Sequence, residues 1–139
     1  MSATSRLFAF LDRVSPPPVA SAHCDLPCGV YDPAQARIEA ESVKAIQEKY
    51  QGNDDPVFRQ RCVLIKEERA DLVKHHLWVL WTDYFKPNHL EAHPELHQLF
   101  WDATKAAGEA KKSQDPKQGD QLLDLIDHID KIFWQTKEA

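Results

Sequence analysis

Three Asp-Pro pairs separate the segments of this chain in which apolar residues recur at helical spacing. They are Asp32-Pro33, Asp55-Pro56 and Asp115-Pro116. Aspartate accepts hydrogen bonds from the free amides of a first helical turn, and proline has no amide hydrogen to leave unpaired there. The pairs therefore predict three helix starts. No convincing strand-like alternation of apolar and polar residues appears along the chain.

The apolar spacing predicts four amphipathic helices, and Gly52 and Pro87 end the first two. Their expected ranges are 33–51, 56–85, 88–111 and 116–136. Because Pro94 lies early in the third range, a separate turn or a kink is expected there. Four amphipathic helices with short connections favour an all-α fold, an antiparallel four-helix bundle.

One face of each expected helix should be buried. The expected core positions are Ala36, Ala40, Val43, Ile46 and Tyr50; Phe58, Cys62, Ile65, Leu72, His76, Val79 and Leu80; Leu96, Leu99, Phe100 and Ala103; and Leu122, Leu125, Ile126, Ile129, Ile132 and Phe133. Cys62 is interpreted as a small core side chain and His76 as a hydrogen-bonded core histidine. The four tryptophans are interpreted as core residues or subunit contacts.

The composition narrows the possible partners. A chain of 139 residues, 42% hydrophobic and 28% charged, fits one globular domain. Its net charge of −5 argues against nucleic acid or an anionic membrane as the main partner. No apolar run is long enough to span a bilayer, and three cysteines argue against a disulfide framework. We expect a cytoplasmic protein with no nucleic-acid or membrane partner.

Residues 1–22 are predicted to be a pro-peptide that is removed on maturation. The three small residues that end it resemble a cleavage site, but its apolar stretch, 7–11, has only five residues. A secretory signal needs roughly 7–15. The prolines at 16–18 favour an extended segment that a protease can reach. A protease is expected to cut before His23, which leaves 23–139 as the mature domain.

The segment 23–31, which we call the hook, concentrates metal-binding side chains. A cut before His23 would expose an α-amine there. That amine, the amide nitrogen of Cys24 and its sulfur would form two five-membered chelate rings. Pro27 would bend the chain so that the Cys28 sulfur completes a plane, with the His23 imidazole above it. Such a plane suits Ni(II) or Cu(II), whereas zinc prefers a tetrahedron.

Spacing alone leaves other uses of the two hook cysteines open. A Cys-x-x-x-Cys pattern is also found in disulfides, thiol pairs and half zinc sites. Three functions therefore remain at this point: a redox metalloenzyme, a non-catalytic nickel or copper carrier, and a thiol redox module in which Cys24 and Cys28 form a disulfide.

The hook and four further segments resemble nickel-dependent superoxide dismutases. The matching segments are 23–34, 37–43, 74–87, 96–100 and 131–134. The resemblance implies a cytoplasmic homohexamer that converts two superoxide and two protons to O₂ and H₂O₂. One nickel ion per subunit would alternate between Ni(II) and Ni(III). Asn88 departs from the pattern, because a second proline is expected after Pro87.

The resemblance also implies roles for individual residues. The implied nickel ligands are the His23 amine and imidazole, the Cys24 amide nitrogen and sulfur, and the Cys28 sulfur. Glu39 and Arg69 would orient the imidazole, Tyr31 and Tyr84 would line the entrance, and Asp25 and Pro27, the latter as a cis-proline, would shape the hook.

Two further groups of residues need an interpretation. Lys86 would help to draw in an anion, or it is a solvated lysine at a helix end. His89, His93 and His97 recur at helical spacing, but no carboxylate completes a Glu-x-x-His pair. We therefore expect the three histidines to form a polar helix face rather than a two-metal site.

Overall fold

The computed structural model describes residues 29–138. The predicted pro-peptide and five predicted hook residues lie outside the described residues: His23, Cys24, Asp25, Pro27 and Cys28. The described elements are α2 (Ala34–Gln51), α3 (Pro56–Val79), the π-helix η1 (Leu80–Tyr84), α4 (Pro87–Ala92), α5 (Leu96–Lys112) and α6 (Pro116–Glu138).

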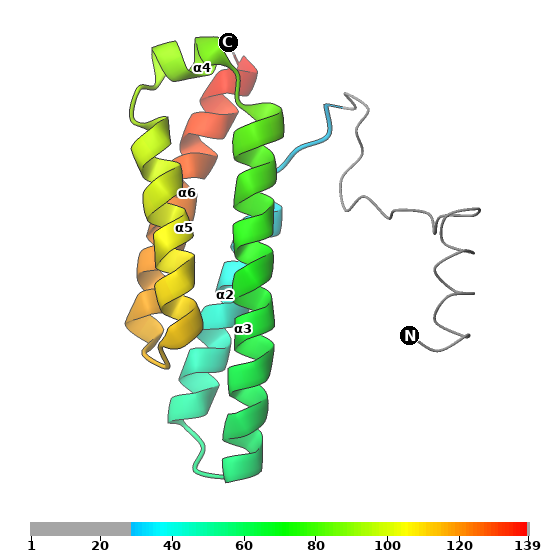
Figure 1. The fold of residues 1–139 in the computed structure, drawn as a ribbon, viewed down its shortest axis with the longest axis vertical. Coiled ribbons are helices and arrows are strands. Elements are labelled where there is room, and N and C mark those ends of the chain that lie inside the picture. The colour runs from blue at the N-terminus through cyan, green and yellow to red at the C-terminus, as the bar shows by residue number, and fades with distance from the viewer. Residues whose placement is uncertain (1–28, 139) are drawn as a thin grey trace, which may run out of the picture.

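Four long helices form an antiparallel bundle, as predicted (Figure 1). α2 packs against α3 and α6, and α5 packs against the same two helices. The short α4 crosses the end of the bundle at which α3 and α6 finish and α5 begins (Figure 1). None of the helices within residues 29–138 is long and apolar enough to cross a membrane.

The Asp-Pro pairs mark helix starts, but not all in the same way. The Asp55 side chain caps α3 as predicted and accepts a hydrogen bond from the Phe58 amide at 3.0 Å. Asp32 lies one position further out, because Pro33 is the N-cap residue of α2. Its carboxylate still accepts from the Ala34 amide at 2.8 Å. An aspartate thus satisfies a first-turn amide in both helices.

The predicted second and third helices are each interrupted. The last turn before Phe85 is a π-helix, in which the Phe85 amide donates to the Leu80 carbonyl at 3.1 Å. Such wide turns often occur at functional sites. The predicted third range contains two helices, α4 and α5, and the break at Pro94 confirms the separate turn or kink expected there, because proline cannot continue the first helix.

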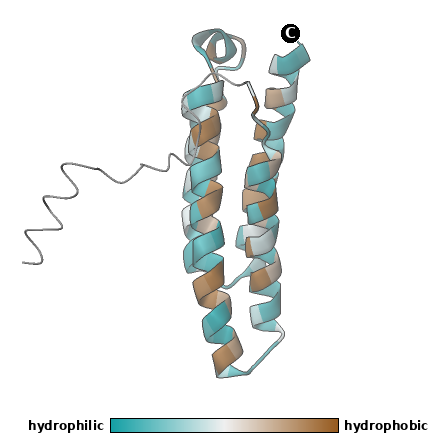
Figure 2. Cartoon of the chain, turned by 90° about the vertical axis from the view of Figure 1, so that its right-hand side faces the viewer, coloured by the Kyte–Doolittle hydropathy of each residue, from teal (hydrophilic) through white to brown (hydrophobic). Residues whose placement is uncertain are grey.

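The predicted core is correct for α5 and α6, apart from the half-buried Leu125, and only partly correct for α2 and α3. Hydrophobic and hydrophilic residues alternate along the helices visible in Figure 2. Ile65, however, is exposed, and His76 is half-buried rather than in the core. The polar residues Gln47 and Lys66 are fully buried instead. Lys66 continues the buried face of α3, which an apolar pattern alone could not reveal.

Lys66 and Gln47 pair with the carbonyl groups that end α5. The Lys66 ammonium donates to the carbonyls of Ala110, at 3.1 Å, Ser113, at 2.8 Å, and Lys111. The Gln47 amide donates to Ala110 and Ser113. The last carbonyls of a helix have no partner within it, so these donors replace the missing amides. Burial lowers the pKa of Lys66 from its ordinary value.

Replacing Lys66 with methionine should lower the free energy of unfolding by about 2–3 kcal/mol, because carbonyls at the end of α5 lose a charged donor. Lys131→Met, on an exposed position of α6, is the matched control and should change it by less than about 0.5 kcal/mol. Urea unfolding of both variants measures the difference. Equal losses in the two variants would contradict the capping role of Lys66.

Candidate metal centre

A pocket lies at the end of the bundle that α4 crosses, and the last residues of the hook contribute to its lining. Its volume is about 360 Å³, and we call it the Tyr31–Tyr84 pocket. It is lined by Gly29, Tyr31, Asp83, Tyr84, Lys86, His89 and Lys137. These residues come from the segment before α2, from η1, from the η1–α4 connection, from α4 and from α6. Gly29, which follows Cys28 in the sequence, therefore lines a cavity whose other walls come mostly from residues 83–137.

Gly29, in the lining of this pocket, has a backbone conformation that favours glycine over other residues. Its φ angle is +70°, in the left-handed region, and no atom would lie within 4 Å of an added Cβ. A side chain would be strained here by the backbone alone and not by crowding. The left-handed conformation at this position is thus one that glycine adopts without strain.

Tyr31 and Tyr84, predicted as a pair, lie together. Their ring centroids are 5.6 Å apart and the rings are tilted by 53°. Tyr84 belongs to η1 and also packs on Phe133 of α6, at 4.4 Å between centroids. Both tyrosines are half-buried. The pocket therefore has a fixed aromatic wall that carries phenol hydroxyl groups.

The pocket lining also brings two ammonium groups together. Lys86 precedes α4, and Lys137 lies in the last turn of α6 with its Nζ 5.1 Å from the centre of the Tyr84 ring. Asp83 is the single carboxylate of the lining. Lys86 was predicted from the sequence as a residue that guides an anion, whereas Lys137 was not. No local pattern marks Lys137, because it reaches the pocket only when the end of α6 packs beside η1.

The three predicted histidines have separate partners and do not converge. His89 lines the pocket and its Nδ1 accepts from the Lys86 amide at 3.2 Å. Burial, the charge of Lys86 and then His93 lower the pKa of His89. His93 lies 3.7 Å from Glu95, and the His97 ring packs on Trp81 at 4.7 Å.

A metal site built from these histidines is therefore not supported. Within residues 29–138, no group of three histidine, cysteine, aspartate or glutamate side chains is arranged to hold a metal ion. His89 differs from the other two because its ring also stacks on Tyr84, with 5.6 Å between centroids and 22° between planes.

Glu39 and Arg69, the predicted positioning pair, form an ion pair between α2 and α3. Arg69 Nη1 lies 3.3 and 3.4 Å from the two carboxylate oxygens of Glu39. The Glu39 side chain is only 16% exposed. Glu39 follows the first residue of α2 by five positions, which corresponds to about 8 Å along the helix axis. The pair thus lies within the first turns of the helix that follows the hook.

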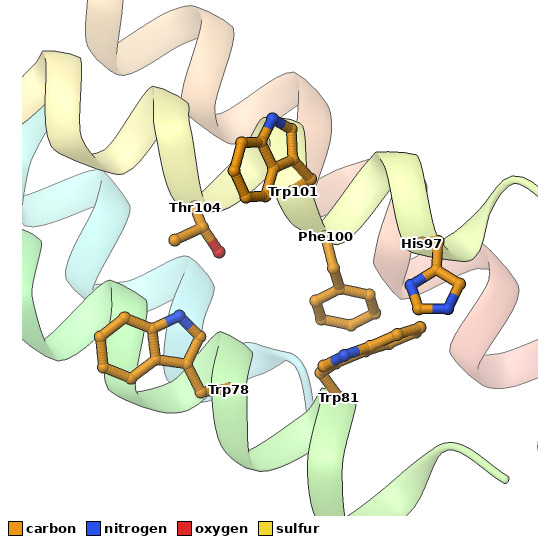
Figure 3. Close-up of a pocket in the computed structure, with 6 residues that line it drawn as sticks. All are labelled: Trp78, Trp81, His97, Phe100, Trp101 and Thr104. Atoms are coloured by element: carbon orange, nitrogen blue, oxygen red, sulfur yellow. The ribbon is translucent and has the colours of Figure 1, made fainter.

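A second hollow, the tryptophan groove, contains mainly aromatic side chains (Figure 3). Its volume is about 280 Å³, and it is lined by Trp78, Trp81, His97, Phe100, Trp101 and Thr104. Trp78 and Trp101 are 51% and 60% exposed, and Trp134 on α6 is 46% exposed. The core interpretation is therefore wrong for these three tryptophans. Cys62, in contrast, is a buried free thiol, as predicted.

The chemistry of the hook and its surroundings fits a soft transition metal. The hook supplies two sulfur atoms and an imidazole, which bind nickel or copper well. The described residues contain two features that such a site would use. They are a charged pair able to orient a ligand, Glu39 and Arg69, and a pocket open to a small molecule.

Comparison with known proteins identifies close relatives along almost the whole chain. The family model described as nickel-containing superoxide dismutase matches residues 18–137. Proteins named superoxide dismutase [Ni] from Streptomyces coelicolor A3(2) and Streptomyces seoulensis are each 64% identical over 135 residues. That alignment covers 97% of this chain and 98% of each relative.

Solved structures agree with these sequence relatives. A native nickel superoxide dismutase structure is 68% identical with a TM-score of 0.82, and 84% of this chain covers 100% of it. A structure of a Ni-containing superoxide dismutase with nickel ligation corresponding to the oxidized state is 67% identical with a TM-score of 0.83, at the same coverage.

Proposed function

The chain belongs to the family of nickel-containing superoxide dismutases, and from that premise we propose that its hook is the nickel site. The activity of the chain is superoxide dismutation with nickel as cofactor. Of the three functions that the cysteine spacing left open, the redox metalloenzyme is therefore the one that applies, and not the non-catalytic metal carrier or the thiol redox module.

The proposed ligands are the α-amine and imidazole of His23, the amide nitrogen and sulfur of Cys24, and the sulfur of Cys28. They bind one nickel ion per subunit, and Asp25 and Pro27 shape the turn between them. When bound, the nickel supplies one-electron chemistry by alternating between Ni(II) and Ni(III). The proposal is supported by Gly29, which follows the ligand Cys28 in the hook and lines the Tyr31–Tyr84 pocket.

Removal of residues 1–22 creates the α-amine that this ligand set requires. The lengths of the relatives support such a step. The full relatives align with 97% of this chain, whereas the chain in the native solved structure is fully covered by 84% of it. Of 139 residues, 84% is about 117, which is the length of 23–139. A protease that cuts before His23 would produce a chain of this length.

The Tyr31–Tyr84 pocket is the proposed route for superoxide. Lys86 and Lys137 attract the anion, against a net protein charge of −5. Tyr31 and Tyr84 narrow the route and hold water beside it, which helps to supply the two protons that peroxide formation consumes. Electrostatic attraction by nearby lysines matters most for a small, charged substrate such as superoxide, because such a substrate can make few other contacts with the protein.

Glu39 and Arg69 are proposed to orient the His23 imidazole. Their ion pair, in a chain of this family, is the observation that carries the assignment. A carboxylate held by a guanidinium keeps its position and its charge, so it fixes the ring and raises the basicity of the ring nitrogen. The imidazole then reaches the nickel in a single orientation.

Replacing Glu39 with glutamine should lower the dismutation rate about 10–100-fold, because a neutral amide no longer fixes a basic imidazole. The matched control is Glu41→Gln, the same change at an exposed position of α2, which should retain the full rate. Superoxide decay after pulse radiolysis measures both, with nickel content determined on the same samples. Equal rates for the two nickel-loaded variants would contradict the assignment.

A homohexamer is the proposed assembly, and the exposed apolar side chains of the single chain support burial between subunits. They are Val30, Ile38, Val57, Leu64, Ile65, Trp78, Trp101 and Trp134. Sedimentation of the nickel-loaded protein should give six times the subunit mass, and a monomer would contradict the proposal. The proposed compartment is the cytoplasm, where the hook thiols stay reduced.

A further inference from the structure

A threonine on the last turns of α6 is bonded to the pocket tyrosine of η1. The hydroxyl oxygens of Tyr84 and Thr136 are 2.7 Å apart, although 52 positions separate the residues. The Thr136 hydroxyl also donates to the backbone carbonyl of Phe133 at 2.6 Å. The three groups form a short chain that leads away from the Tyr31–Tyr84 pocket.

The direction of these hydrogen bonds follows from counting hydrogens. A carbonyl oxygen can only accept, so Thr136 must donate its single hydroxyl hydrogen to Phe133. Thr136 therefore has only its lone pairs left for Tyr84. In the 2.7 Å pair the phenol of Tyr84 must be the donor. Its hydrogen points to Thr136, and its oxygen keeps only acceptor capacity for the pocket.

The rest of the Tyr84 side chain is held by its neighbours. Phe133 and Phe85 pack on the ring at 4.4 and 5.0 Å between centroids, and the His89 ring stacks at 5.6 Å. Lys137 Nζ lies 5.1 Å from the ring centre. Since the ring is enclosed in this way, rotation of the hydroxyl hydrogen is the main freedom left to Tyr84. Thr136 removes it.

We propose that Thr136 is a positioning residue, which turns the Tyr84 hydroxyl away from the pocket so that Tyr84 accepts, and does not donate, a hydrogen bond there. This inference rests on the proposed place of Tyr84 beside the route of superoxide. A water in the pocket then donates one hydrogen to Tyr84 and keeps its other hydrogen for the incoming anion. An anion such as superoxide can only accept hydrogen bonds. In this orientation the pocket water, which moves easily, is the group that donates a hydrogen bond to it.

The orientation can be tested without the reaction. In full-length protein labelled with ¹³C at the tyrosine ζ carbons, the ζ-carbon isotope shift in mixed H₂O and D₂O reports how fast each hydroxyl hydrogen exchanges. The protein has three tyrosines, so a Tyr84→Phe spectrum assigns the signal. Thr136→Val should speed exchange at Tyr84 by about tenfold, the equivalent of one hydrogen bond. Thr136→Ser, which keeps the hydroxyl, should restore slow exchange.

The unsubstituted protein provides a check that does not depend on any variant at Thr136. The Raman doublet of Tyr84, obtained as the difference from the Tyr84→Phe protein, should have the intensity ratio of a phenol that donates a hydrogen bond, either alone or together with one that it accepts from water. The ratio of a phenol that only accepts would overturn the proposal. So would hydroxyl exchange at Tyr84 that is equally fast in the unsubstituted, Thr136→Val and Thr136→Ser proteins.

Rates of the nickel-loaded enzyme then connect the orientation to function. Thr136→Val should lower the dismutation rate about three- to tenfold, Thr136→Ser should restore it, and in a Tyr84→Phe background Thr136→Val should add nothing. A loss of rate that persists in the Tyr84→Phe background would mean that Thr136 does not act through Tyr84, which would overturn the proposal. If Tyr84→Phe keeps the full rate, the place of Tyr84 beside the route fails, while the exchange experiment still decides the orientation.

Discussion

A protein in which Cys28 is replaced by serine is expected to hold no nickel and to lose dismutation down to the uncatalysed background. A serine hydroxyl stays protonated at neutral pH and is a hard donor, whereas the cysteine thiolate is soft and donates electron density to the metal. Loss of this sulfur would leave the proposed plane with three donors and would put Ni(III) out of reach. Nickel content per subunit and superoxide decay measure the two losses.

The chain contains its own matched control for this substitution. Cys62 is a buried free thiol on α3, and Cys62→Ser exchanges the same atom at a position outside the proposed ligand set. It should cost some stability, because a hydroxyl replaces a small apolar group in the core. Its nickel content and rate should stay normal. One nickel per subunit and a full rate in Cys28→Ser would refute the assignment of Cys28 as a ligand.

The second large effect is expected at the new chain end. A mature protein that keeps one extra residue, Ala22, before His23 should lose its dismutation activity. The extra peptide bond converts the α-amine into an amide. That change removes a strong nitrogen donor and alters the first chelate ring, although every side chain of the hook is still present. Mass spectrometry defines the first residue, and superoxide decay and nickel content are measured on the same sample.

Acetylation of the α-amine separates the donor from the length of the chain. Protein that begins at His23 and is then acetylated at its amine should be as inactive as the protein that retains Ala22. Protein that begins at His23 with a free amine should be active. An active protein with its N-terminus at Ala22 would show that the α-amine is not a ligand, and the chelate proposal would have to be abandoned.

Sequence patterns predicted most of the bundle because the relevant physics is local. Asp55 caps α3 through an amide three residues away, and the apolar repeat of α6 buries Leu122, Ile126 and Ile129 as expected. A repeat of apolar residues cannot identify a buried lysine. Lys66 was therefore missed, because its burial depends on the carbonyls of α5, more than forty residues away.

The candidate site divides in the same way. The ligand hypothesis for the hook depends on neighbouring residues, since the chelate rings of His23 and Cys24 involve consecutive atoms of the chain. The Glu39–Arg69 and Tyr31–Tyr84 pairs were predicted only from the resemblance to the family. The structure brings the members of each pair together. Neither a local sequence pattern nor the resemblance to the family pointed to Lys137 or Thr136.

By itself, the sequence determined the helix periods, the helix starts and the donor chemistry of the hook, because each depends on residues a few positions apart. The tertiary structure alone decided the surroundings of Tyr31 and Tyr84. The end of α6 packs beside η1, and this contact places Lys137 and Thr136 at Tyr84. The direction of the Tyr84 hydroxyl is therefore a property of packing, since it depends on a hydrogen bond between residues that 52 positions of chain separate.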